Sequence, residues 1–145
     1  MTPQYHIMVV DDAVGDVQLV KLAVAEAPYP CAVTTAGNGR EALDKLRGDD
    51  TPSRPDLIFL DLNMPQMNGK ETLKELKSDP DLATIPVVVL STSAVDRDVT
   101  ASYALGASGY ITKPMDMDEF FQAVRRVEEY WFNTVRRPLK LLSAT

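Results

Sequence analysis

Short apolar segments without polar alternation constrain the fold of this chain more than any other feature. They span residues 7–10, 57–60, 87–90 and, more weakly, 110–112. Continuous apolar runs of this length are typical of parallel strands that helices cover on both faces. Residues 31–36 form a further short segment that is rich in β-branched residues, which predicts an edge strand.

Segments with helical spacing separate these strands and predict five helices. The fourth, over residues 95–105, is only weakly amphipathic. The fifth is the clearest, because Asp116 and Glu119 form an acid-led version of the capping box at its start. Its core face is expected to carry Met117, Phe120, Val124, Val127 and Trp131, and the helix is expected to continue until Pro138. Strands that alternate with helices predict an open parallel sheet with helices on both sides.

The length and the charge of the chain limit the functions that are open to it. Its 145 residues are enough for one compact domain and too few for two ordinary ones. A formal net charge of -6 argues against DNA binding, which depends on clustered Lys and Arg. No apolar run is long enough to cross a membrane, and the single cysteine, Cys31, cannot form an intramolecular disulfide. We therefore expect a cytoplasmic protein.

Charged and hydroxyl residues follow the predicted strands directly. Asp11 and Asp12 follow the first strand, Asp61 the third, Ser91 the fourth and Lys113 the fifth. Parallel strands end at the same edge of a sheet, and ligands bind at this edge in open α/β folds. The sequence therefore predicts that these side chains form one site.

Three carboxylates in one pocket repel each other unless a cation lies between them. Mg²⁺ prefers oxygen ligands and keeps several waters. We expect Asp12 and Asp61 as direct ligands, Asp11 as a ligand through water, and the backbone carbonyl of Asn63 as a further ligand. One carboxylate oxygen of Asp61 then stays free to attack a phosphoryl group. This chemistry is that of a protein that catalyses its own phosphorylation and slow dephosphorylation, and not that of a conventional enzyme.

Phosphoryl transfer depends mainly on alignment and on neutralisation of the phosphoryl oxygens. The Lys113 ammonium offers a positive charge for this purpose, and the Ser91 hydroxyl offers a hydrogen-bond donor. Thr92, the next residue in the chain, is the alternative donor. Asp61, Ser91 and Lys113 are therefore the predicted catalytic residues.

The sequence around these residues resembles the response-regulator receiver domains of two-component systems. The similar blocks are VVDDA, FLDLNMPQMNG, VVVLSTSA and GYITKP, which begin at residues 9, 59, 87 and 109. The resemblance implies a flavodoxin-like, three-layer fold with a five-stranded parallel sheet in the order 2-1-3-4-5. It places the receiver domain at residues 1–127 and leaves a helix extension and tail at residues 128–145.

The resemblance also implies a donor and a switch. The donor to Asp61 would be a phosphohistidine of a sensor histidine kinase, and the output would be contact with a downstream protein. Ser91 and Tyr110 would move on phosphorylation, and a cis bond between Lys113 and Pro114 would direct the amine into the site. The long interval between Asp12 and Asp61 and the aromatic last helix resemble small receiver proteins that serve bacterial phytochrome kinases.

Other functions fit parts of this pattern. Phosphatases of the haloacid-dehalogenase kind also use an aspartate nucleophile, Mg²⁺ and a lysine, but they usually carry a second aspartate where this chain has Asn63. A receiver-like module that is never phosphorylated usually loses a signature residue, and this chain has all of them. A transcription factor needs a helix-turn-helix domain, for which the residues after 127 are too few.

The last helix carries apolar residues in excess of its expected core face. They are Phe121, Tyr130, Phe132 and Val135, followed by Leu139, Leu141 and Leu142. Contiguous apolar surface of this kind usually marks a protein contact. We therefore predict a homodimer through the last helix and the tail, related by a two-fold axis. The alternative is that Phe121 and Tyr130 pack on a neighbouring element of the same chain.

Overall fold

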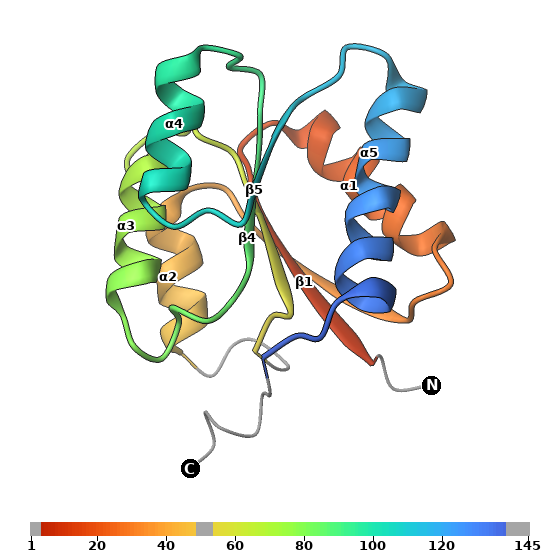
Figure 1. Cartoon of the computed structure of the whole chain (residues 1–145), viewed down its shortest axis with the longest axis horizontal. Helices are drawn as coiled ribbons and strands as arrows, with labels where there is room; N and C mark the ends of the chain where they lie inside the picture. Colours follow the sequence, from red (N-terminus) through yellow and green to blue (C-terminus); the bar gives the residue numbers. More distant parts are fainter. Residues whose placement is uncertain (1–3, 49–53, 139–145) are drawn as a thin grey trace.

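The sheet has the predicted topology in the computed structural model, which describes residues 4–48 and 54–138. Its strands lie in the order β2-β1-β3-β4-β5 (Figure 1), and every neighbouring pair is parallel. The strands are β1 (Tyr5–Val10), β2 (Cys31–Ala36), β3 (Leu57–Leu60), β4 (Val87–Ser91) and β5 (Gly109–Thr112).

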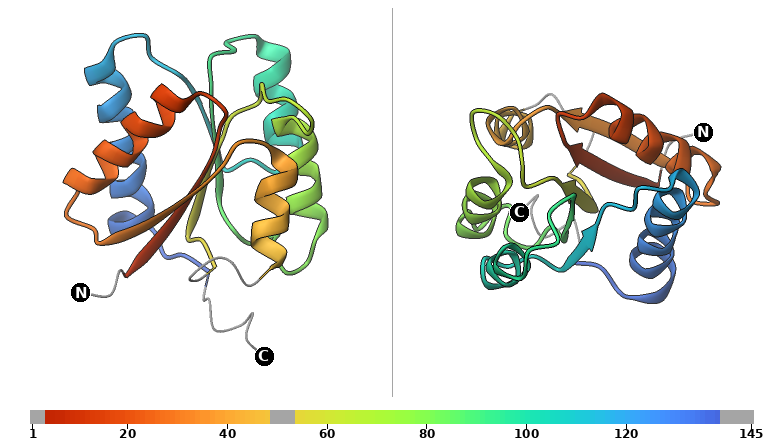
Figure 2. Two further views of the ribbon diagram at one scale, coloured as in Figure 1. Left: turned by 180° about the vertical axis from the view of Figure 1, so that it is seen from behind. Right: turned by 90° about the horizontal axis from the view of Figure 1, so that it is seen from above.

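Helices cover both faces of this sheet, which confirms the three-layer flavodoxin-like architecture. On one face lie α1 (Val14–Glu26) and α5 (Met117–Glu129), side by side (Figures 1 and 2). The other face is covered by α2 (Gly39–Arg47), α3 (Gly69–Ser78) and α4 (Asp96–Ala104). No helix of the described ranges combines the length and the apolar composition that a membrane span needs.

The continuous apolar strands supply two cores, one on each face of the sheet. In β3, Leu57 and Phe59 pack toward α1 and α5, whereas Ile58 and Leu60 pack toward α2 and α3. All four are at most 1% exposed. Removing a side chain of this size from water contributes about 2 kcal/mol. Burial on both faces is therefore the physical reason for the lack of polar alternation in these strands.

Two neighbouring helices on the α2–α4 face differ in how firmly they are built. Helix α3 begins with a capping box in which Asn68 and Glu71 each accept a backbone hydrogen bond from the other, and it buries Leu73 and Leu76. Helix α4 has no side-chain cap, and Ser102 is the only buried residue within it. The weak amphipathicity of residues 95–105 thus corresponds to a helix with few apolar contacts.

The last helix continues beyond α5 as predicted, but its winding changes. Residues Tyr130–Thr134 form a π-helical turn, η1, in which the Val135 N–H donates to the Tyr130 carbonyl oxygen at 3.0 Å. A π turn holds more residues than an α turn, so the side chains after it are rotated from the expected faces. The helix ends before Pro138, and residues 139–145 lie outside the described part of the chain.

This change of winding corrects part of the predicted core face. Phe120 and Val124 are buried as expected, and Val127 and Trp131 are half-buried. Met117 is 66% exposed, because it lies in the first turn, ahead of the buried part of the helix. Phe132, which was expected outside the core, is 8% exposed and stacks on Tyr5 with ring centroids 4.4 Å apart. The predictions for Met117 and Phe132 were therefore wrong.

Candidate functional site

The structure brings the predicted site residues together at the carboxyl ends of the strands. Asp11 and Asp12 follow β1, Asp61 follows β3, Lys113 follows β5, and Ser91 is the last residue of β4. Backbone hydrogen bonds extend the sheet past the strand ends. The Asp61 N–H donates to the last carbonyl of β1 at 2.9 Å, and the Lys113 N–H donates to the Ser91 carbonyl at 2.7 Å. These bonds fix the spacing of the side chains that follow.

The acidic residues form a cluster that fits a divalent cation. Asp11, Asp12 and Asp61 each offer a carboxylate oxygen, and these oxygens lie within 4.8 Å of one another. Asp11 and Asp61 are buried, whereas Asp12 is exposed. Several carboxylate oxygens at this separation match the ligand set of a hard dication, which would also relieve their mutual repulsion.

A single buried amine lies among these carboxylates. The Lys113 Nζ is 2.8 Å from Asp11 Oδ2, 2.8 Å from Asp16 Oδ2 and 3.8 Å from Asp61 Oδ2. Burial by itself would lower the pKa of Lys113, but the hydrogen bonds to Asp11 and Asp16 and the charge of Asp61 outweigh it and raise that pKa. Lys113 is therefore a permanent positive charge in the site.

Asp61 is a carboxyl with an elevated proton affinity. Burial raises the pKa of Asp61 to about 6. The positive charge of Lys113 lowers this pKa, and the negative charge of Asp11 raises it further. The backbone N–H groups of Asn63 and Leu62 donate hydrogen bonds to the carboxylate and limit the rise of the pKa. Any cation that binds here gains from the poorly compensated negative charge of Asp61.

The loop after β3 approaches Asp61 very closely. A Cβ atom at Gly69 would lie 2.2 Å from the Asp61 carbonyl oxygen, so only glycine fits there. Gln66 has a φ of 65°, a left-handed conformation that turns the loop. The loop borders an open hollow of about 390 Å³ next to the acidic cluster, whose lining includes Asp12, Asn63 and Lys70. The hollow gives a ligand access to this edge of the sheet.

Ser91 and Thr92 differ in burial. Ser91 is fully buried at the end of β4, and its Oγ accepts a hydrogen bond of 3.3 Å from the Ser93 N–H. Thr92 is exposed. The buried position favours Ser91 as the hydroxyl of the site.

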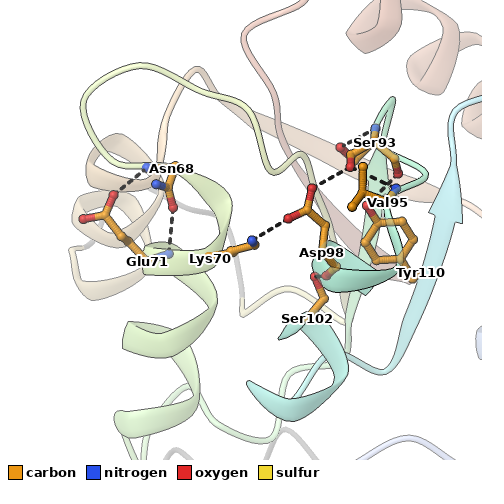
Figure 3. A network of polar contacts seen from close by, with 9 residues as sticks. Asn68, Lys70, Glu71, Ser93, Val95, Asp98, Ser102 and Tyr110 are labelled. Carbon is orange, nitrogen blue, oxygen red and sulfur yellow. Dashed lines mark hydrogen bonds and ion pairs between the residues drawn. The ribbon is translucent and has the colours of Figure 1, made fainter. Parts of the chain in front are cut away.

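Polar contacts connect the region after β4 to helices α3 and α4 (Figure 3). The Lys70 Nζ on α3 is 2.5 Å from Asp98 Oδ1 on α4, and the Ser93 Oγ donates to Asp98 Oδ2 at 2.6 Å. The half-buried Tyr110 donates its hydroxyl to the Ser93 carbonyl oxygen at 2.8 Å. Tyr110 therefore contacts the loop that leads from Ser91 into α4.

The peptide bond before Pro114 is a correction to the predicted site. Within residues 4–48 and 54–138 no peptide bond is cis, so Lys113–Pro114 is trans. The ammonium of Lys113 reaches Asp11 and Asp16 from this geometry. The trans isomer is also the favoured one for most X–Pro bonds. The prediction of a cis bond was wrong.

Three residues at or next to the site were not predicted from the sequence: Asp16, Lys70 and Asp98. Asp16 lies in the first turn of α1, and its contact with Lys113 spans 97 positions of the chain. Its position four residues after Asp12, at a helix start, was the available signal. Lys70 and Asp98 were missed because an ion pair between two helices leaves no trace in the spacing of either one.

Comparison with known proteins agrees with this geometry. The sequence pattern of the response regulator receiver domain matches residues 7–125, so the chain belongs to that family. Its role is that of a phosphoacceptor in two-component signalling. The chain is 37% identical over 139 residues to the response regulator Rcp1 of Synechocystis sp., covering 94% of this chain and 95% of Rcp1.

Two solved structures are similar over nearly the whole chain. One is the phosphorylated cyanobacterial phytochrome response regulator RcpA, with 44% identity and a TM-score of 0.89, covering 93% of this chain and 99% of RcpA. The other is the Mn²⁺-bound form of Rcp1, with 37% identity and a TM-score of 0.87, covering 93% of this chain and 99% of Rcp1. The acidic cluster and the Mn²⁺-bound relative together support a divalent metal site.

Proposed function

We propose that Asp61 accepts a phosphoryl group from the phosphohistidine of a sensor histidine kinase, and that this kinase is a phytochrome. The observation that carries the proposal is the setting of the Asp61 carboxyl. It is buried, and one of its oxygens lies within 4.8 Å of a carboxylate oxygen of Asp11 and of Asp12. Its Oδ2 lies 3.8 Å from the Lys113 Nζ. Similarity to the phytochrome response regulator RcpA supports the assignment of the kinase.

The transfer exchanges one bond for another. A carboxylate oxygen of Asp61 attacks the phosphorus atom, the P–N bond to the donor imidazole breaks, and its electron pair stays on the imidazole nitrogen. Asp61 must be ionised to attack, and its pKa of about 6 leaves it mostly ionised at neutral pH. Lys113 donates to one phosphoryl oxygen and Ser91 to another. Attack by water on the acyl phosphate later returns the carboxylate and releases phosphate.

The acidic cluster would hold Mg²⁺. Asp12 and Asp61 would be direct ligands, Asp11 would bind through water, and the backbone carbonyl of Asn63 would complete the protein ligands. A dication bound there supplies positive charge against the oxygens of the phosphoryl group. Carboxylate and carbonyl oxygens are the ligands that Mg²⁺ prefers. Asp12 is exposed, which leaves room for the waters that Mg²⁺ keeps.

The test uses a small phosphodonor and two matched aspartate variants. Wild type, Asp61→Asn and Asp44→Asn are incubated with phosphoramidate, with and without Mg²⁺, and followed by intact mass. Asp44 is exposed on α2 and serves as the control. Wild type and Asp44→Asn should gain one hydroxylamine-sensitive phosphoryl group only with Mg²⁺, and Asp61→Asn should gain none. A phosphoryl group that persists in Asp61→Asn, or that resists hydroxylamine, would contradict the proposal.

Ser91 and Tyr110 would carry the signal into α4. The buried Ser91 hydroxyl would move toward the phosphoryl group, and the loop that holds Tyr110 through the Ser93 carbonyl would follow. Helix α4 has few apolar contacts, so a small change in charge can shift its position. We expect amide exchange over residues 92–109 to change when beryllofluoride binds, while α3 stays unchanged. Equal exchange over residues 92–109 in both states would contradict this switch.

Output is proposed to occur through protein contacts in the cytoplasm, with a homodimer formed by the last helix and tail. The exposed Tyr130 and the half-buried Phe121 support such a contact, whereas the buried Phe132 does not. The division into a receiver domain (residues 1–127) and an extension (128–145) remains a prediction. Light scattering on the intact chain and on a truncation after Pro138, which keeps Phe132 in place, tests the dimer. Monomers for the intact chain at tens of micromolar would contradict it.

A further inference from the structure

We infer that Asp16 is a positioning residue that holds the Lys113 ammonium back from Asp61 and so keeps the attacking oxygen of Asp61 free of a direct hydrogen bond. This inference rests on the proposed function of Asp61. It concerns a carboxylate on α1 that lies outside the cluster of candidate metal ligands.

The distances define how the ammonium is shared. Lys113 Nζ is within hydrogen-bond length of Asp11 Oδ2 and Asp16 Oδ2, at 2.8 Å each. The 3.8 Å to Asp61 Oδ2 is too long for a hydrogen bond. An ammonium has three N–H donors. Two of them are therefore engaged by Asp11 and Asp16, and Asp61 does not take the third.

The position of Asp16 suits it to restrain the amine. It lies in the first turn of α1, where the helix dipole stabilises a negative charge. Its side chain is 31% exposed, whereas that of Lys113 is 5% exposed. Asp16 therefore approaches the buried ammonium from the solvent side and from a different element than Asp11 and Asp61. Because it is not part of the oxygen cluster, its carboxylate acts on the ammonium and not on a metal ion.

Loss of this carboxylate changes the balance of forces on Lys113. Without Asp16, the nearest unsatisfied negative charge is that of Asp61, and the ammonium closes the gap of 3.8 Å to form a direct hydrogen bond. That bond occupies an oxygen that must attack phosphorus, and it lowers the electron density on the nucleophile. Phosphorylation then slows although every predicted catalytic residue is present.

The experiment compares three variants of the full chain with wild type. Asp16→Ala removes the acceptor, and Asp16→Asn keeps an oxygen acceptor without the charge. Asp118→Ala is the matched control, because Asp118 is an exposed acid in the first turn of α5. Among the described residues it forms no ion pair with Lys113, whose carboxylate neighbours are Asp11, Asp16 and Asp61. The rate of phosphorylation by phosphoramidate is measured with Mg²⁺ present. The chemical shift of the Lys113 ammonium nitrogen is measured by NMR in the unphosphorylated protein, which reports on the amine independently of activity.

We expect Asp16→Ala to slow phosphorylation about tenfold, less than the roughly hundredfold loss that a 1 Å misplacement in a reacting site can cause, because the ammonium is displaced and Asp61 is not. The Lys113 ammonium signal should shift, Asp16→Asn should be slowed less, and Asp118→Ala should match wild type. A rate for Asp16→Ala within about twofold of wild type, or an unshifted Lys113 signal, would overturn the inference. If Asp16→Ala does not fold, the same criteria apply to Asp16→Asn, with a loss of about threefold expected. Failure of the proposed function is distinct, because wild type and Asp118→Ala would then also remain unphosphorylated.

Discussion

Two buried carboxyls lie at opposite ends of this molecule and are treated differently by their surroundings. Burial is the main cause of a raised pKa in both, to about 6 at Asp61 and to about 7 at Glu128. Asp61 has the Lys113 ammonium nearby, backbone N–H donors and a hollow that opens to solvent. Glu128 on α5 is fully buried, and neither of its oxygens has a hydrogen-bond partner among the described residues.

The difference indicates what each carboxyl does. The negative charge of Asp61 is partly compensated by Lys113 and by backbone N–H groups. This compensation keeps Asp61 ionised near neutral pH, and the remaining charge can still attract a cation. Among the described residues, only the charge of Arg125 opposes the effect of burial on Glu128, so its site favours the neutral form. Its charge would also act on Cys31 at the start of β2, whose pKa burial raises to about 12. One carboxyl is suited to chemistry, and the other stays protonated in the core up to a pKa of about 7.

The largest expected effect comes from removing the compensation at Asp61. Lys113→Ala leaves three carboxylates around the position of one ammonium. It should lower the free energy of unfolding by roughly 3 kcal/mol in metal-free buffer at pH 7. This value is at the low end for a broken buried ion pair, because the site opens to solvent. Added Mg²⁺ should recover part of this loss. Chemical denaturation measures both values, with Lys21→Ala on the exposed face of α1 as the control. An unchanged free energy would contradict the compensation described for Asp61.

An effect that reaches the same size only at its upper bound is expected from removing the charge at Glu128. The folded protein holds this proton up to a pKa of about 7, whereas an ordinary glutamate releases it near 4.5. Folded molecules therefore bind more protons, and wild-type stability falls as the pH rises from about 4.5 to about 7. Glu128→Gln should abolish this fall and be more stable than wild type at pH 8 by up to about 3 kcal/mol, with no difference at pH 4.

The neighbouring Glu129 gives a matched control for that titration. Hydrogen bonds from Tyr29 and Asn133 lower the pKa of Glu129, so its stabilising effect is present at high pH and lost as the pH falls. Glu129→Gln should therefore bring no gain at pH 8. Equal stability of Glu128→Gln and wild type from pH 4 to pH 8 would show that Glu128 finds a partner that compensates its charge.

The smallest effect concerns Asp61 itself. Its pKa is raised from 3.8 to about 6, so the ionised carboxylate destabilises the metal-free fold increasingly as the pH rises through that interval. Asp61→Asn should be more stable than wild type by about 2 kcal/mol at pH 7.5 without metal, less than the full shift because the site opens to solvent. Mg²⁺ should stabilise wild type and not the variant. If Mg²⁺ leaves the melting temperature of wild type unchanged, Asp61 does not bind a cation and does not differ from Glu128 in this respect.

Some residues of the site and of the core could be predicted from the sequence, and others could not. Asp11, Asp61 and Lys113 were predictable because each follows an apolar strand, and parallel strands end together. Glu128 lies four residues after the buried Val124, so a charged residue on the apolar stripe of the last helix was a visible but unused signal. Phe132 could not be assigned to the core from periodicity, since the π turn interrupts the helical repeat. The contact of Asp16 with Lys113 depends on side-chain conformation across two elements, which residue spacing does not encode.

The central claim is that Asp61 is the residue that carries the phosphoryl group. Borohydride reduces an aspartyl phosphate to homoserine, which permanently marks the phosphorylated position. Wild-type protein is phosphorylated with phosphoramidate and Mg²⁺, reduced, digested and sequenced by tandem mass spectrometry. We predict homoserine at residue 61 and unmodified aspartate at residues 11, 12 and 16. Homoserine at any of those three positions, or unmodified Asp61 in a sample that had taken up one phosphoryl group, would contradict the claim.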